Sequence, residues 1–278
     1  METIVRSIYA SHLANCMMMR RPFSVLPNST LNQKFNLFKD ELPASNEYPV
    51  LGYLGIGNKG ATYEVTDTGF ILTTPVRHLP RDASLYNFIP FLIRDINNDI
   101  SSTERTKYRL RVPITIGNTT YVAYYLRALS LSNLVPSVEL RNVDDENITT
   151  NSFTPTQSDL APNHPNLGNT NLNTANGDYL VATSKVNFVL NQSDIQEIMD
   201  ACTILFGDPR YAVINEIAIV SGIDKILQGT FGGATSNYTE VVAAQCATFI
   251  AQYHALTSNS TKVEIELDIG AVEPLLVS

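Results

Sequence analysis

The chain has 278 residues, of which only 17% are charged, and its net charge is −8. This acidic balance argues against a nucleic-acid-binding protein, which needs clustered basic side chains to contact phosphates. No apolar run approaches the ~18 residues of a membrane-spanning helix, so we expect no membrane partner.

The first segment, residues 1–48, is predicted to be an extended N-terminal arm. Its apolar stretch is interrupted by His12 and Asn15, which is not typical of a secretory signal, so we expect none. The segment could be a short helix or an extended arm, and it carries three methionines and the apolar residues Ile4, Val5, Ile8 and Leu13. Two uses are open: the segment is fastened to its own chain, or it reaches a neighbouring subunit.

Residues 49–140 are predicted to form a β-rich region with short helices. Within it, residues 49–74 have the alternating apolar residues and glycine turns of a β-meander. The apolar segment 82–93 contains Pro90, and it predicts a short helix that ends or bends at this proline.

The next predicted helix begins at a capping box formed by Ser101 and Glu104 and runs through Tyr108. Residues 119–128 are β-branched and aromatic, which predicts a strand. Residues 141–178 are rich in Asn, Thr, Asp and Pro, and they are too long for an ordinary connection. We interpret them as a polar excursion or a linker.

Residues 179–278 are predicted to form a mostly antiparallel sheet packed by two helices, which makes the fold class α+β. Strands are expected at 179–190, 211–220 and 262–269. Alternation in the first of these predicts one face formed by Leu180, Ala182, Val186, Phe188 and Leu190, and the other by Thr183, Lys185 and Asn187.

The first of the two helices is predicted to begin at a capping box, Ser193–Gln196, and to end at Gly207. The second is predicted to begin at Asn237, with a stripe of apolar residues at helical spacing through Tyr253.

A formal GxGxxG pattern occupies Gly55, Gly57 and Gly60. A dinucleotide-binding loop requires a helix to begin inside this pattern, so that its N–H groups meet the phosphates. The residues that follow are strand-like instead, and the pattern therefore predicts turns of a hairpin rather than a phosphate cradle.

Few residues could carry catalysis or bind a metal. His12 and Cys16 are four residues apart, but no second pair lies nearby in the sequence. His78 could act as a general base only beside a nucleophile, and no nucleophile motif is present, so hydrogen bonds within a turn are expected. The cysteines form no CxxC pair. We therefore expect no enzymatic activity, no cofactor, no metal and no small-molecule substrate.

Several segments together resemble a known family. They are GYLGIGNKG, the block TTPVRHLPRDASLYNFIPFLIRDINNDISSTERTKYRLR, YVAYYLRAL, NGDYL, VINEIAIVSGIDK and ELDIGAVEPLL. They cover most of the chain from about residue 22 onward, and they are similar to virion structural proteins of tailed bacteriophages with contractile tails. The resemblance implies a neck or baseplate component that assembles in many copies in the host cytoplasm, with other virion proteins and copies of itself as partners.

The end of the sequence supplies further candidate interaction residues. Pro274 removes a backbone donor and is expected to end the last strand, which leaves Leu275, Leu276 and Val277 beyond it. These three residues, with Ile4 and Ile8, are the predicted interaction residues, although Leu275, Leu276 and Val277 could instead fold onto their own core.

The predicted function is a structural subunit of a phage tail, neck or baseplate. The alternative is a host-surface or glycan-binding tail module.

Overall fold

The computed structural model describes residues 3–67, 69, 71–131, 134–144, 147–162, 178–231, 234–256 and 262–274. The chain forms two compact units. The large unit consists of Met1–Ser130 and Leu190–Val263, and the small unit consists of Leu131–Val189 and Glu264–Ser278. Strands dominate and helices are few, so the predicted α+β class with antiparallel sheets is confirmed.

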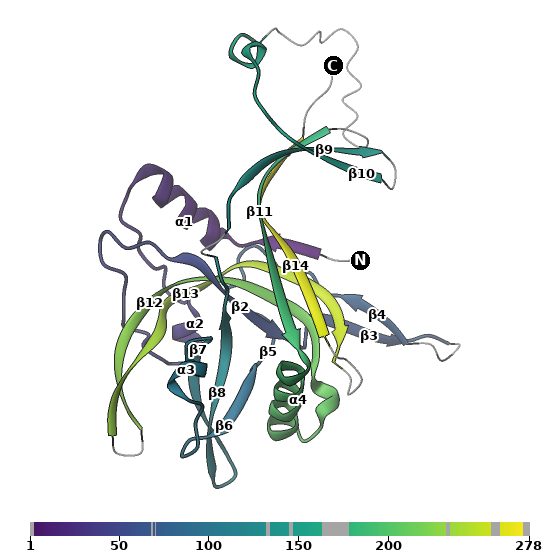
Figure 1. The fold of residues 1–278 in the computed structure, drawn as a ribbon. Helices are drawn as coiled ribbons and strands as arrows, with labels where there is room; N and C mark the ends of the chain where they lie inside the picture. The colour runs from purple at the N-terminus through teal and green to yellow at the C-terminus, as the bar shows by residue number, and fades with distance from the viewer. Residues whose placement is uncertain are drawn as a thin grey trace. The chain divides into compact units, whose positions relative to one another are not determined.

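The large unit is built on an eight-stranded sheet (Figure 1). Six strands follow one another across it, and β5 and β7 pair with β2 and β8 beside this path. In spatial order the strands are β1 (Thr3–Arg6), β13 (Ala234–Ala255), β12 (Val213–Phe231), β2 (Val50–Gly57), β8 (Thr119–Ala128) and β6 (Leu92–Asp95), with β5 (Phe88–Ile89) and β7 (Tyr108–Ile116) beside them.

Short elements surround this sheet. The hairpin of β3 and β4 forms a separate two-stranded sheet. The bounds are β3 (Ala61–Val65), β4 (Ile71–Pro75), α1 (Ile8–Met19), α2 (Leu31–Lys34), α3 (Ser102–Arg105), α4 (Gln192–Phe206) and a 3-10 turn, η3 (Pro209–Tyr211). In the described part of the chain, no helix has both the length and the apolar character needed to cross a membrane.

The predicted second helix of the C-terminal half is wrong, because its residues lie in the long strand β13. Residues 240–247 are all buried, so this stretch of the strand has no exposed face. A strand buried on both faces lacks the apolar–polar alternation that identifies strands in a sequence. Its continuous apolar run fits a helical stripe equally well.

The predicted helix at 82–93 is also wrong, since β5 and β6 lie there on either side of Pro90. Proline has no N–H for a strand ladder, so it separates the two short strands rather than ending a helix. The prediction of a short capped helix after Ser101 is confirmed, although α3 ends at Arg105 and Tyr108 already begins β7.

The predicted helix ending at Gly207 is confirmed as α4. Its N-cap is Asn191, whose side chain accepts the N–H of Asp194, rather than Ser193. The apolar positions Ile195, Ile198 and Cys202 are buried, as their helical spacing predicts.

Residues 1–48, predicted to be an extended arm, contain β1 and α1. β1 pairs antiparallel with β13, with Ile4 opposite Ile250. Ser7 follows the strand, and its N–H and Oγ donate to the carbonyls of Ala247 (2.9 Å) and Cys246 (2.7 Å). This segment is therefore fastened to its own chain.

The small unit is a four-stranded sheet in the order β10-β9-β11-β14. Its strands are β9 (Ser137–Asp144), β10 (Asn147–Ser152), β11 (Asp178–Asn191) and β14 (Lys262–Pro274). β14 ends at Pro274, as predicted. Along β11 the predicted buried face is confirmed at Val186, Phe188 and Leu190, but it is wrong at Ala182, where Val181 and Thr183 are buried instead.

The predicted polar excursion at 141–178 includes the end of β9, all of β10 and a 3-10 turn, η1 (Gln157–Leu160). Residues 163–177 lie outside the described residues, and so do the predicted interaction residues Leu275, Leu276 and Val277.

Candidate functional site

A buried carboxylate organises one part of the large unit. Glu216 on β12 is 0% exposed. Its Oε1 accepts the backbone N–H groups of Lys59 (3.1 Å) and Asn87 (2.9 Å). Its Oε2 accepts the N–H of Tyr86 (2.9 Å) and lies 3.1 Å from Nε2 of His78. One side chain thus holds three separate segments of the chain together.

His78 is the buried partner of this carboxylate. Its ring stacks between Tyr86 and Phe249, with centroid distances of 4.2 and 4.3 Å. Its Nδ1 lies 3.2 Å from Asp82 Oδ2, so the imidazole bridges two carboxylates. Among the described residues, no Ser, Thr or Cys side chain bonds to His78, and this arrangement is one that positions the chain rather than one that activates a nucleophile.

The glycines of the GxGxxG pattern allow the backbone to approach Glu216. Gly55 and Gly57 lie inside β2, so the expectation that they form turns is wrong for these two. A Cβ at position 57 would lie 2.5 Å from the carbonyl oxygen of Asn87 and 2.6 Å from Glu216 Oε1. Only glycine leaves the space for this contact.

The loop after β2 is fixed by side-chain acceptors. The N–H of Gly60 donates to Asn215 Oδ1 at 2.6 Å, and Lys59 N–H donates to Glu216. Nδ2 of Asn215 donates in turn to the carbonyl oxygen of Asn58 (3.2 Å). The two loop N–H groups are therefore occupied, and they are not available to a phosphate.

Directly beside this loop lies an open groove of about 790 Å³. It is lined by amide, aromatic and basic side chains together with two aliphatic ones: Asn58, Lys59, Ala61, Tyr63, Asn87, Phe206, Arg210, Tyr211 and Val213. The amides are connected: Asn87 Nδ2 donates to Asn58 Oδ1 (2.6 Å), and Asn58 Nδ2 donates to the carbonyl oxygen of Tyr211 (3.0 Å).

The aromatic side chains of the groove are solvent-accessible. Tyr63 and Tyr211 are about half exposed, and Phe206 is 39% exposed. The rings of Phe206 and Tyr211 pack with their centroids 5.3 Å apart at the end of α4 and in η3. The lining of the groove therefore combines exposed aromatic rings with hydrogen-bonded amide side chains.

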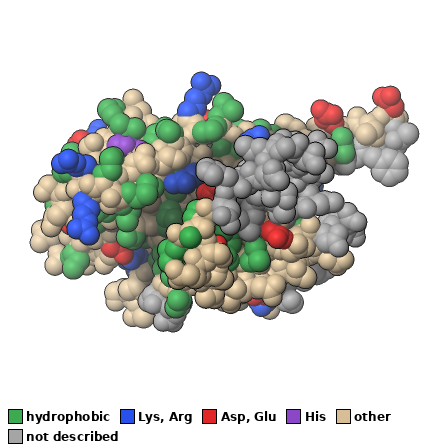
Figure 2. All heavy atoms as spheres, turned by 90° about the horizontal axis from the view of Figure 1, so that it is seen from above, with side chains coloured by type: hydrophobic (Ala, Val, Ile, Leu, Met, Phe, Trp, Pro, Cys, Tyr) green, Lys and Arg blue, Asp and Glu red, His purple; other side chains and the backbone are tan. Residues whose placement is uncertain are grey.

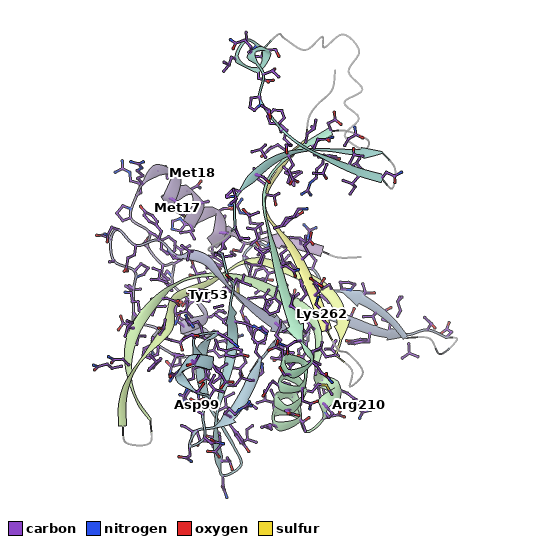
Figure 3. The ribbon with its side chains drawn as sticks, viewed as in Figure 1. Met17, Met18, Tyr53, Asp99, Arg210 and Lys262 are labelled. Atoms are coloured by element: carbon purple, nitrogen blue, oxygen red, sulfur yellow. The ribbon has the colours of Figure 1, made fainter. Side chains whose placement is uncertain are left out.

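The charged lining of the groove is basic. Of the described residues that line it, Lys59 and Arg210 are the charged ones. Arg210, labelled in Figure 3, bonds to Asp208 and lowers the pKa of that carboxyl. In the described residues, the Lys59 ammonium has no carboxylate within ion-pair distance.

A second candidate surface lies on β1 and α1. Its side chains are apolar and exposed, and Met17 and Met18 are labelled in Figure 3. We call it the N-terminal apolar surface; its members are Ile4 (62% exposed), Ile8 (54%), Met17 (48%), Met18 (76%) and Met19 (63%). Within the same helix, Leu13 and Cys16 are buried against Phe23.

Basic residues flank the N-terminal apolar surface. Arg6, Arg20 and Arg21 are all exposed. Figure 2 shows hydrophobic side chains exposed next to Lys and Arg side chains on the face that it draws. Of the predicted interaction residues, the structure thus places Ile4 and Ile8 on one exposed segment.

Two further networks serve the fold. Glu240 is 1% exposed and accepts the N–H groups of Leu110 (2.6 Å), Arg111 (3.1 Å) and Val241 (2.9 Å). Burial raises the pKa of Glu240, and these N–H groups oppose that effect.

In the second network, Asp224 accepts bonds from Arg109 (2.7 and 2.8 Å) and from the Tyr53 hydroxyl (2.7 Å). Burial alone would raise the pKa of Asp224, but the bonds from Arg109 and Tyr53 outweigh it, and the pKa is lowered.

His12 and Cys16, whose side chains are of kinds that bind metals, do lie side by side on α1, with Cys16 Sγ 3.9 Å from His12 Nε2. Among the residues that the structure describes, no three His, Cys, Asp or Glu side chains cluster as they would around a metal ion. Two side chains do not complete a metal site.

The chain belongs to a family of unknown function, DUF7208, whose model matches residues 1–278. Neither a curated protein nor a solved structure matches the chain.

Proposed function

We propose that this chain is a structural subunit of a bacteriophage virion, in the tail, neck or baseplate. It would assemble in many copies in the host cytoplasm, with copies of itself and other virion proteins as partners. The observation that carries the proposal is the N-terminal apolar surface, because its side chains are exposed on a segment that is fastened to its own sheet.

Exposed apolar side chains on an ordered segment favour a protein interface. Fully burying one such side chain contributes roughly 1.5–3 kcal/mol. Methionine adapts its shape to different partners and is frequent on binding surfaces. Met17, Met18 and Met19 end α1, and consecutive helical residues point in different directions, so these exposed side chains surround the last turn of the helix. A partner that encloses this turn would bury all three.

The edge of the sheet supports the same function. β1 is the terminal strand in the order of the large sheet, and within the described residues it pairs only with β13. An edge strand offers unpaired N–H and C=O groups to a strand from another chain. The arginines beside it suit an acidic partner surface, which a chain of net charge −8 can itself provide.

The test compares two apolar-to-acidic substitutions. Met18→Asp changes the N-terminal apolar surface, while Val65→Asp changes a similarly exposed residue (74%) on β3. We expect the unmodified chain to form large particles by light scattering and negative-stain microscopy, and Met18→Asp to prevent this without lowering the melting temperature. Val65→Asp should assemble normally. If Met18→Asp assembles as well as Val65→Asp, this surface is not the interface.

A separate measurement addresses the virion itself. Particles of the phage that encodes this chain, purified on a density gradient, should contain it in many copies by quantitative mass spectrometry. Its absence from such particles would contradict the proposed function, whatever the purified chain does alone.

The alternative, a host-surface or glycan-binding module, is favoured by the groove at Lys59 and Tyr211. Retention of the purified chain on host cell envelopes would support it.

A further inference from the structure

We propose that the groove between the loop after β2 and the end of α4 binds an acidic saccharide, whose carboxylate pairs with Lys59. This site goes beyond the assembly function. It uses none of the residues of the N-terminal apolar surface, and either proposal can fail without the other.

The groove is organised before any ligand arrives. Glu216 holds the backbone of Lys59 and Asn87, and Asn215 holds Gly60. Asn58 ties this loop to the carbonyl oxygen of Tyr211. A site whose parts are already held in place loses little conformational entropy on binding.

The amide side chains of the groove suit hydroxyl groups. Each of the amides of Asn58 and Asn87 has two N–H donors, and the bonds described above use one donor of each. The carbonyl oxygen of the Asn87 amide adds an acceptor. A sugar hydroxyl both donates and accepts, so neighbouring hydroxyls match amides that offer both.

The walls suit the apolar face of a sugar ring. Phe206 and Tyr211 present exposed rings from one side and Tyr63 from β3, and the pyranose C–H face can pack against such rings. Exposed aromatic side chains with a few oriented polar groups are the usual lining of a small-molecule site.

The charge selects an acidic ligand. The chain carries 27 acidic against 19 basic residues, yet the charged residues that line the groove are Lys59 and Arg210. Arg210 bonds to Asp208, which leaves Lys59 as the cation for a ligand anion. A lysine ammonium forms charge-assisted hydrogen bonds with a carboxylate.

A phosphate ligand fits this groove less well. Phosphate sites are usually built from several backbone N–H groups that point at the anion. Here the N–H groups of Lys59 and Gly60 both bond to buried side chains. A single lysine with occupied neighbouring amides suits a sugar carboxylate better than a nucleotide.

The experiment is saturation-transfer-difference NMR on the full chain. The acidic probes are tetragalacturonate and sialyllactose, the neutral probe is cellotetraose, and ADP is the phosphate probe. We expect at least one acidic saccharide to bind, and to bind more tightly than cellotetraose and ADP. Lys59→Gln should weaken that binding about tenfold, the loss expected for one charge-assisted hydrogen bond.

Two further variants locate the site. Tyr211→Ala should weaken binding of the same saccharide by removing the ring surface, while Lys39→Gln, an exposed lysine outside the groove, should leave it unchanged. All variants should keep the melting temperature of the unmodified chain. Absence of binding by both acidic probes, tighter binding of ADP or cellotetraose, or equal binding by Lys59→Gln and Lys39→Gln would each overturn the proposal.

Discussion

Glu216 shows how one buried charge can fix several segments. A carboxylate removed from water is costly unless hydrogen bonds replace its hydration. Here three N–H groups and an imidazole do so, from residues 59, 86, 87 and 78. The charge therefore specifies where the loops that form the groove must lie.

We predict that Glu216→Gln destabilises the chain. A carboxylate only accepts hydrogen bonds, whereas the glutamine amide would turn N–H donors toward backbone N–H groups. Each buried donor left without an acceptor costs about 1–3 kcal/mol, so chemical denaturation should show a loss of at least that size. Glu64→Gln on the exposed strand β3 is the control, and its free energy of unfolding should not change. Equal stability of the two variants would mean that Glu216 does not hold the loops.

A second prediction compares two glycines of β2. At Gly57 a new Cβ would collide with Asn87 and Glu216, while at Gly52 the nearest atom is 3.8 Å away. Overpacking of a rigid site costs about 1–3 kcal/mol. Gly57→Ala should lower the free energy of unfolding by about that amount, and Gly52→Ala should leave it nearly unchanged. A tolerated Gly57→Ala would contradict the close approach of β2 and Glu216.

A third prediction concerns pH and Asp224, whose pKa is lowered mainly by Arg109 and Tyr53 against the effect of burial. A carboxyl with a lowered folded-state pKa contributes stability above its unfolded pKa of about 3.9 and loses it as the pH falls through the folded value. Asp224→Asn should therefore be less stable than the unmodified chain at pH 6, and the difference should shrink toward pH 2.

Melting temperatures of both proteins between pH 6 and pH 2 would check this prediction. Glu240 changes the stability of the folded chain in the opposite direction, because its pKa is raised. Its contribution to stability is present at low pH and is lost as the pH rises through its folded-state pKa. Both proteins retain Glu240, so the difference between them isolates Asp224. A difference that stays constant with pH would mean that the ion pair does not titrate in this range.

The candidate site was only partly predictable at the level of residues. The sequence YAVINEIAIV contains Asn215 and Glu216 inside an apolar strand, and two polar residues in a buried strand need partners. That signal could have identified both. The groove itself joins residues near 60, 87 and 210, and no local pattern shows that these segments meet.

At the level of elements, α4 was predictable because its apolar positions follow the helical repeat and its ends carry capping residues. β14 was predictable because Ile265 and Leu267 alternate with exposed charges. β13 was not, because a strand that is buried on both faces shows no period of two. No pattern in the sequence predicts that β13 pairs with β12.

The C-cap of α4 gives a prediction at this scale. Gly207 has φ of +77°, and no atom lies within 4 Å of a Cβ built there. A side chain at this position would therefore cause no steric clash, and its cost would be the strain of the left-handed backbone. The left-handed conformation costs a non-glycine residue roughly 1–2 kcal/mol. Gly207→Ala should reduce the free energy of unfolding by about 1 kcal/mol, whereas Gly207→Asn should lose less, because asparagine tolerates this conformation. Equal losses in the two variants would show that strain is not the cause.

At the scale of the whole molecule, the two units differ in the apolar surface that they bury. The large unit buries most of the core, including Leu54, Ile56, Tyr124 and Phe249. All six residues of β10 in the small unit are exposed. Local opening of a segment costs less free energy where fewer apolar contacts must be broken.

We therefore predict that hydrogen exchange will divide the chain by unit. Glu216–Val220 of β12 and Val241–Ala247 of β13 are buried, and their amides should exchange only through opening reactions close to the full free energy of unfolding. The amides of β9 and β10 are paired as well, from Asn147 opposite Asp144 onward, but they lack a buried layer of side chains. They should exchange through much smaller openings, by native-state exchange followed by mass spectrometry in increasing denaturant. Protection of β10 that matches β13 would show that burial does not set local stability here.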